Sequence, residues 1–379
     1  MSGLPIARLF GIEIRLALSW VFVIAIVTVT IGGQLRAIQP EAPELLAWVI
    51  GGMASLGFLV ATVAHELAHA LVARRVGMDV PVISVHFIGG PAAVDVRAPT
   101  PRGEAAVALA GPLVSLAIGG GAVLIAFAVA AFGLNSVVAE LIADVAFLVG
   151  SLCLVLAAVS IIPAYPLDGG RLVRAIAWAR TGSDRRGAKA AGTVGRGIGW
   201  ILIGSGLAVI LVGEAGNGVM IALIGWFLGA SSRSVDRWLL LDALVSGVRV
   251  DEAMEPELDT IGPQLTLDTF GSQVLDGTLG PVLPVVRDDV LLGMIGSGQL
   301  RSVPQRDWPS TRTADVMIDA AELPSLRPDE TLADGLERLR TSQLEGLPVL
   351  DGTKIRGMLT RRSIAVTLRA RADLRGVSL

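Results

Sequence analysis

The chain has 379 residues, of which 53% are hydrophobic and only 17% are charged, against about 25% charged in an average soluble domain. A net charge of −3 argues against a nucleic-acid partner, and the single cysteine, Cys153, excludes an intrachain disulfide. This composition is typical of a protein embedded in a lipid bilayer.

Six apolar stretches are candidates to cross the bilayer, which takes about 20 residues in a helix. They are residues 16–31, 46–76, 105–131, 139–162, 194–212 and 219–230. Six spans place both termini on the same side of the membrane. Basic residues gather after the second and the fourth span, so the positive-inside rule predicts that these connections and both termini are cytoplasmic.

The second span contains the sequence His65-Glu66-Leu67-Ala68-His69. Residues four apart share a helix face, so both imidazoles can reach one metal ion. Glu66 follows the first of them and can take a proton from a water molecule at the metal. Ionisable side chains at membrane depth are costly and mark function. The pattern predicts a zinc protease that cuts inside or at the edge of the bilayer.

Catalytic zinc usually has three protein ligands, and His86 is the only other histidine of the chain. A carboxylate is therefore the natural third ligand, and Asp168 is the best candidate. It follows the prolines that end the fourth span, level with the two histidines at the cytoplasmic rim. The alternative is that Asp168 only begins an Asp-Gly-Gly turn. We favour one zinc ion per chain, held by His65, His69 and Asp168.

Residues 80–96 alternate imperfectly around a Gly-Gly-Pro turn and predict a β-hairpin at the membrane face. Its edge strand could hold substrate in an extended form, although a plain surface loop is the alternative. His86 lies in this segment. It is either a structural hydrogen-bonding residue or a group that stabilises the oxyanion or binds zinc in a resting state.

Other charged residues have simpler interpretations. Glu104, at the start of the third span, is interpreted as a charge at a helix N-terminus. The basic cluster between Arg171 and Lys189 is interpreted as an anchor near anionic lipid.

From about residue 246 the sequence becomes polar, and an internal repeat appears. The sequence LPVV at 283–286 recurs as LPVL at 347–350, and GMI at 293–295 recurs as GML at 357–359. The offset of 64 residues indicates duplicated units that pack together. Each unit is predicted to contain a helix followed by two strands.

These motifs resemble those of the site-2 protease family of intramembrane zinc metalloproteases (peptidase M50-like). HELAH lies in one span, Ala-Gly-Pro at 110–112 in a later one, and PAYPLDGGR at 163–171 follows another. This resemblance covers about residues 10–235. It implies that His65, His69 and Asp168 bind zinc, that Glu66 is the catalytic base, and that the second to fourth spans form the core. The internal repeat resembles a tandem CBS pair.

The expected architecture is an α-helical polytopic membrane protein with a soluble α/β tandem CBS domain. The protease domain is expected at residues 1–240, and the CBS domains at 246–309 and 310–373.

Four positions depart from the patterns of these families. Ser160 and Ser115 stand where asparagine is usual, and with His86 they form the expected substrate-binding or oxyanion set, since a hydroxyl still donates one hydrogen bond. Gln299 and Ser363 stand where nucleotide-binding CBS modules often have an aspartate for the ribose. Binding of adenosine nucleotides is therefore doubtful.

The sequence thus predicts a zinc metalloprotease that cleaves single-span or membrane-tethered proteins near the cytoplasmic face of the membrane. Its CBS pair is expected to modulate cleavage and to form a homodimer. One alternative is a CBS-gated membrane protein that binds or transports zinc. Another is a proteolytically silent scaffold whose serine substitutions have removed catalysis.

Overall fold

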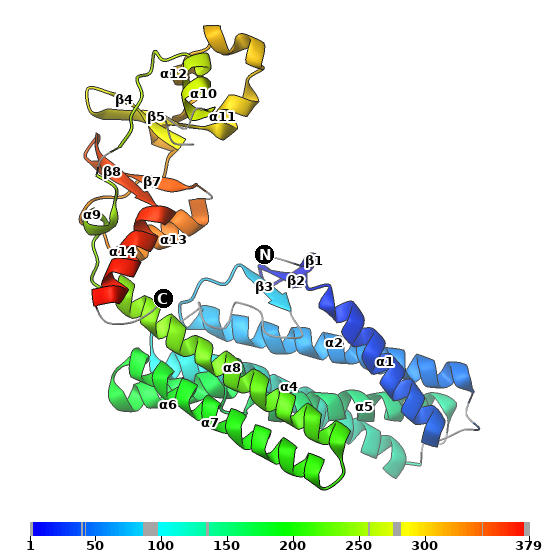
Figure 1. Cartoon of the computed structure of the whole chain (residues 1–379). Helices are drawn as coiled ribbons and strands as arrows, with labels where there is room; N and C mark the ends of the chain where they lie inside the picture. The colour runs from blue at the N-terminus through cyan, green and yellow to red at the C-terminus, as the bar shows by residue number, and fades with distance from the viewer. Residues whose placement is uncertain are drawn as a thin grey trace. The chain divides into compact units, whose positions relative to one another are not determined.

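The computed structural model describes residues 3–38, 41, 43–85, 98–133, 136–256, 258–275, 282–342 and 344–374. The chain divides into two compact units, Met1–Leu239 and Leu240–Leu379. Long helices dominate the first unit, whereas the second combines short helices with a sheet (Figure 1). The predicted fold class, a polytopic helical protein with an α/β CBS region, is confirmed.

Six helices in the described part of the chain are long and apolar enough to cross a membrane. They are α1 (Ser19–Ile38), α2 (Glu44–Arg75), α4 (Pro101–Ala131), α5 (Val137–Ser160), α7 (Asp184–Leu211) and α8 (Ala215–Val245). Large apolar side chains such as Phe22, Leu124 and Trp200 are exposed on them, as lipid contact requires. The predicted spans are therefore helices, and α7 and α8 continue well into polar sequence.

A further helix, α6 (Asp168–Thr181), lies in the connection between α5 and α7, where the sequence predicted a loop. It packs against α4 and α7. Helices α4 and α5 cross closely at Gly119, where an added Cβ would lie 2.9 Å from the carbonyl oxygen of Gly150. Small residues at such a crossing let two backbones meet in lipid, where dispersion contacts drive helix association.

A small sheet precedes α1. Strands β1 (Leu4–Leu9) and β2 (Ile12–Leu16) are antiparallel, and β3 (Val82–Val85) pairs parallel with β2. Phe10 and Gly11 turn the chain with φ values of 51° and 75°. The buried residues of this sheet pack on the helices in one apolar cluster. Its buried members are Ile14, Trp20, Val23, Phe58, Ala61, Val85 and Cys153.

The first strand of the hairpin predicted at residues 80–96 is present as β3, which among the described residues pairs with β2, near the N-terminus. Residues 86–96 lie outside the described residues, so the second strand of the hairpin stays a prediction. Strands β1 and β2 were not predicted, although residues 12–16 alternate strictly between apolar and charged side chains, the signal of a half-buried strand.

The second unit contains one sheet of five strands in the order β4-β5-β8-β7, with β6 paired to β5. The strands are β4 (Val282–Arg287), β5 (Val290–Gly296), β6 (Ile318–Asp319), β7 (Gly346–Asp351) and β8 (Lys354–Thr360). The β4–β5 and β7–β8 ladders have irregularities between residues 285 and 286 and between residues 349 and 350. These places are 64 residues apart, so the structure reproduces the repeat of the sequence.

Helices flank each pair of strands at equivalent places. Helices α10 (Leu267–Leu275) and α13 (Leu332–Ser342) precede them, and α11 (Ser297–Ser302) and α14 (Arg361–Leu374) follow them. The predicted order of one helix and then two strands is therefore correct. Shorter helices, α9 (Val250–Ala253) and α12 (Thr313–Val316), begin the two repeats.

The two repeats interlock. Val248 and Val250, from the first repeat, are buried in the apolar core of the second repeat with Leu332. Conversely, Val316 and Met317, from the second repeat, pack against the core of the first. Among the described residues, neither contiguous repeat therefore contains its complete core. The domain limits 246–309 and 310–373 stay a prediction.

Candidate metal centre

The three predicted metal ligands converge in the membrane unit. His65 and His69 lie one turn apart on α2, and their Nε2 atoms are 3.1 Å apart. Asp168, the first residue of α6, places Oδ2 3.4 Å from Nε2 of His65 and Oδ1 3.3 Å from Nε2 of His69. The ligand atoms of these three side chains all lie within 4.8 Å of one another. Among the described residues, no other group of three or more histidine, cysteine, aspartate or glutamate side chains is arranged to hold a metal ion.

The residues fit a zinc ion. Two imidazole nitrogens and one carboxylate are a donor set of catalytic zinc, with a fourth position left for water or substrate. Gly111 on α4 faces the imidazoles. A Cβ at this position would lie 2.6 Å from Nε2 of His65 and would also collide with Nε2 of His69. Only glycine leaves this space beside the ligand atoms.

Helix α4 also orients both imidazoles from behind. Nδ1 of His69 lies 2.7 Å from the carbonyl oxygen of Val107. A carbonyl can only accept, so Nδ1 donates and the lone pair of Nε2 is free for a metal. Nδ1 of His65 lies 2.8 Å from Oγ of Ser115, a residue that is 0% exposed. Val107, Gly111 and Ser115 recur every four residues, so one face of α4 supports both rings.

The charge of Asp168 suits its place. An ordinary aspartate carboxyl group has a pKa of about 4, so Asp168 is ionised at neutral pH, as a metal-binding carboxylate must be.

The remaining predicted site residues lie at different places. Glu66 is on α2 beside His65, and its side chain is partly exposed. Ser160 is the last residue of α5 and is buried. The hydroxyl of Ser115 is in contact with His65, which suits a role in orienting that ring. Roles for Ser115 and Ser160 in binding substrate or the oxyanion stay predictions, and His86 lies outside the described residues.

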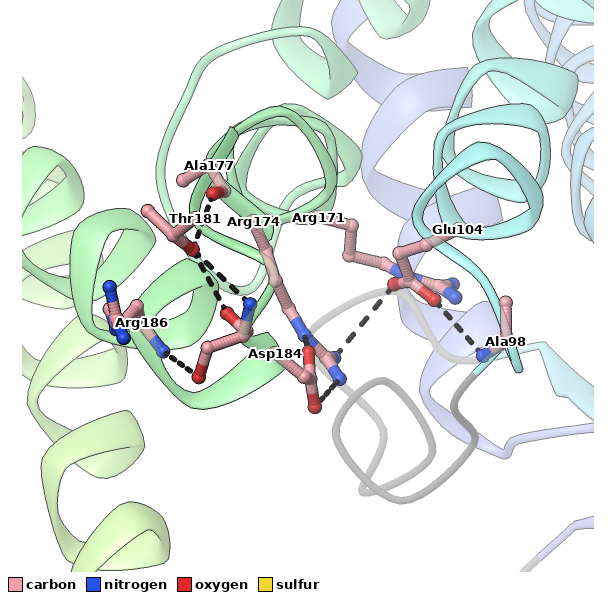
Figure 2. Close-up of polar contacts among 9 residues, drawn as sticks. Ala98, Glu104, Arg171, Arg174, Ala177, Thr181, Asp184 and Arg186 are labelled. Carbon is pink, nitrogen blue, oxygen red and sulfur yellow. Dashed lines mark hydrogen bonds and ion pairs between the residues drawn. The ribbon is translucent and has the colours of Figure 1, made fainter. Parts of the chain in front are cut away.

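A buried polar network that was not predicted from the sequence lies next to this centre. Glu104 is 0% exposed, and its Oε1 accepts a hydrogen bond from Nε of Arg171 at 2.9 Å. Arg174 is 3% exposed and is bonded to Asp184. Figure 2 shows these side chains meeting between α4, α6 and α7. Glu104 lies in the first turn of α4, as predicted, but it is buried and paired there. Arg171 and Arg174 bond within this network and are not lipid anchors.

Two pKa shifts follow from this burial. Burial alone lowers the pKa of Arg174, but hydrogen bonds to Asp184 raise it above its usual range. Burial raises the pKa of Tyr165, which Arg174 counteracts only in part. At neutral pH the arginine is charged and the tyrosine is neutral. The sequence signal for the network was that Glu104 is the only acidic residue of the largely apolar α4.

Comparisons with known proteins agree with this geometry. Residues 53–202 match the sequence profile of Peptidase family M50, and residues 314–369 match that of the CBS domain. Rip3 of Mycobacterium tuberculosis, named as a zinc metalloprotease, is 31% identical over 370 residues, which cover 96% of this chain and 92% of that protein. The chain belongs to peptidase family M50.

Two further matches extend over much of the chain. The protein sll0528 of Synechocystis, also named as a zinc metalloprotease, is 28% identical over 375 residues and covers 98% of this chain and 97% of its own length. The solved site-2 protease from Methanocaldococcus jannaschii is 24% identical, with a TM-score of 0.40, and covers 61% of this chain and 94% of that one. The predicted family, enzyme class and zinc cofactor are confirmed.

Proposed function

We propose that this enzyme cleaves single-span or membrane-tethered proteins within the bilayer, near its cytoplasmic face, in regulated intramembrane proteolysis. One zinc ion per chain is held by His65, His69 and Asp168, and Glu66 is the catalytic base. The convergence of the three ligand side chains inside a group of membrane-length helices carries this proposal.

The chain's own residues perform the proton transfers. Bound zinc supplies Lewis-acid polarisation of the scissile carbonyl and acidifies a water molecule. Glu66 takes a proton from the attacking water, whose oxygen bonds to the carbonyl carbon. Glu66 then gives this proton to the leaving nitrogen as the C–N bond breaks, which yields a carboxylic acid and an amine. Val107 and Ser115 hold the two imidazoles in place throughout.

Substrate must reach this centre in an extended form, because a helix hides its carbonyl groups in its own hydrogen bonds. Strand β3 lies within the segment at residues 80–96 that is predicted to hold substrate. We propose that this segment holds an unwound substrate in an extended form by strand addition.

The proposed orientation of the chain across the membrane rests on the distribution of basic residues. Four basic residues in the connection before α7 and in its first turns are exposed, namely Arg180, Arg185, Arg186 and Lys189. They support a cytoplasmic position for this end of the helices by the positive-inside rule. The active-site opening, both termini and the CBS pair are then cytoplasmic.

The CBS pair is proposed to modulate the protease and to join two chains in a homodimer, with no dependence on adenosine nucleotides. Oε1 of Gln299 accepts a hydrogen bond from the backbone nitrogen of Gly296 at 3.0 Å. Oγ of Ser363 accepts one from the backbone nitrogen of Thr360 at 3.1 Å. Both residues at the ribose positions thus cap helices. Calorimetry of the purified protein with ATP, ADP and AMP should show no binding, and micromolar affinity for any of them would refute this proposal.

The central experiment compares membrane proteomes of cells that produce the wild-type enzyme or Glu66→Gln. Removing a general base lowers the rate by about 10²–10⁴-fold, so uncleaved substrates accumulate in the variant. The purified variant should still hold one zinc ion per chain. New protein ends that lie inside spans and depend on Glu66 support the function. Unchanged cleavage by Glu66→Gln would exclude Glu66 as the base.

A further inference from the structure

Glu104 is a fully buried carboxylate that takes no part in the proton transfers described above. Its Oε1 accepts from Nε of Arg171 at 2.9 Å and lies 3.9 Å from Nη1 of Arg174. Its Oε2 accepts from the backbone nitrogen of Ala98 at 3.2 Å. All these contacts appear in Figure 2. A buried charge at membrane depth is costly, and by default it marks a functional site.

The network around Glu104 is electrically balanced. Asp184, on α7, accepts two hydrogen bonds from Arg174, at 2.7 and 2.9 Å. The side chains of Arg171 and Arg174 are only 12% and 4% exposed. Two carboxylates and two guanidinium groups therefore neutralise one another, and of the four side chains Asp184 is the most exposed, at 20%. Replacing one member leaves an uncompensated charge, whereas replacing a pair does not.

The network is directly connected to the third metal ligand. Asp168 and Arg171 lie three residues apart on α6, so they share one face of this helix. The preceding residue, Leu167, gives α6 no side-chain cap. The Arg171–Glu104 ion pair is thus a specific polar contact that fixes the first turn of α6, which carries Asp168, to α4.

Helix α4 consequently serves as the common reference for all three ligands. Val107 and Ser115 orient His69 and His65, as described above. Glu104, three residues before Val107 on the same helix, holds α6. A shift of α6 relative to α4 would move the Asp168 carboxylate away from the imidazole nitrogens, which now lie 3.3 and 3.4 Å from it.

We propose that Glu104 is a positioning residue for the metal centre: through Arg171 it sets the place of the Asp168 carboxylate relative to His65 and His69. This inference rests on the proposed role of Asp168 as a zinc ligand. It differs from a purely structural role, in which the network would stabilise the helices without affecting the metal.

The test uses the full-length protein in detergent and the variant Glu104→Gln. Zinc affinity is measured by competition with a chelator, and the geometry of the centre is measured from the visible absorption of the Co²⁺-loaded protein. Loss of a residue that orients a metal ligand typically weakens metal binding about 10–100-fold. We expect a loss of this size and a changed Co²⁺ spectrum.

Asp184→Asn is the matched control. It also removes one carboxylate from the network, but it acts on Arg174 from α7 and leaves the Arg171–Glu104 pair intact. We expect lower thermal stability with wild-type zinc affinity and Co²⁺ spectrum. Equal losses of zinc affinity in Asp184→Asn and Glu104→Gln would overturn the proposal, because the effect would then be general.

A double variant separates lost positioning from a buried unpaired charge. Glu104→Gln with Arg171→Gln removes one charge of each sign, so it is also the variant to measure if Glu104→Gln does not fold. Zinc affinity should remain weakened, because the link between α4 and α6 is still missing. Wild-type affinity in the double variant would overturn the proposal. Asp168→Ala tests the underlying assignment separately: full zinc affinity there would exclude Asp168 as a ligand.

Discussion

The membrane unit and the CBS unit distribute polar groups in opposite ways. In the membrane unit the buried polar residues include a histidine, a glutamate and an arginine: His65, Glu104 and Arg174. Among the described residues of the CBS unit, the buried polar residues are Thr313 and Ser363, whose hydroxyls bond to backbone groups.

The difference reflects the surroundings of each unit. Water solvates the charged groups on the surface of the CBS unit. The stability of this unit comes from its buried aliphatic clusters. Lipid offers charges no such solvation, so Glu104, Arg171 and Arg174 of the membrane unit are buried and paired. The interior of the membrane unit is consequently where precise chemistry can be built, and substitutions there should change function more than the same substitutions in the CBS unit.

The largest effect is expected at Gly111. A Cβ in Gly111→Ala would occupy the space beside both imidazole Nε2 atoms, 2.6 Å from that of His65. We expect zinc and proteolysis to be lost. Gly120→Ala is the control, since it lies on the same helix with nothing within 4 Å of the added Cβ. Metal analysis of both purified variants decides the matter, and a zinc-loaded, active Gly111→Ala would contradict the described geometry.

A smaller effect is expected at Ser115, whose hydroxyl is 2.8 Å from Nδ1 of His65. Ser115→Ala removes this orienting partner and should weaken zinc binding about 10–100-fold. Ser55→Ala is the control because Ser55 is also buried and hydrogen-bonded, to Thr28 and to the carbonyl oxygen of Gly51. Chelator competition should show normal zinc affinity for Ser55→Ala. Normal affinity for both variants would assign Ser115 a different role.

Much of this metal centre could be predicted from the sequence, because the spacing of His65 and His69 on one helix requires no knowledge of the fold. Asp168 was found through the rarity of other ligands and through a family motif. Glu104 could not be interpreted in this way. Its partner Arg171 is 67 residues away, and the pairing depends on how α6 packs against α4.

The sheet illustrates the same limit. Local alternation identified Val82–Val85 as a strand, but it could not show that β2, near the N-terminus, lies beside it. Which strands pair is a tertiary property, and local alternation carries no information about a distant partner. The presence of the membrane-spanning helices was easier to predict than the pairing of strands. An apolar stretch long enough to span a membrane has few alternatives to a helix.

In the CBS unit, the interlocking of the repeats can be tested with valines. Val250 is 0% exposed in the core of the other repeat, and Val250→Ala should lower the free energy of unfolding by roughly 1–3 kcal/mol. Val366→Ala, at a valine that is 60% exposed, is the control and should have little effect. Thermal denaturation of a fragment of residues 240–379 measures both. Equal stabilities would show that the first repeat does not complete the second.

The smallest effect is expected at the exposed ion pair of Arg327 and Asp329, whose closest atoms are 2.6 Å apart. Arg327 lowers the pKa of Asp329. A lowered carboxyl pKa favours the folded state above the ordinary carboxyl pKa, and this contribution is lost as the pH falls through the lowered value. Both side chains are exposed, however, so water and salt screen the attraction. We therefore expect the double variant Arg327→Ala and Asp329→Ala to unfold at the wild-type temperature at pH 7, in low and in high salt. A clear loss of stability that high salt removes would show that the CBS unit, like the membrane unit, depends on its charged groups, and the contrast between the two units would fail.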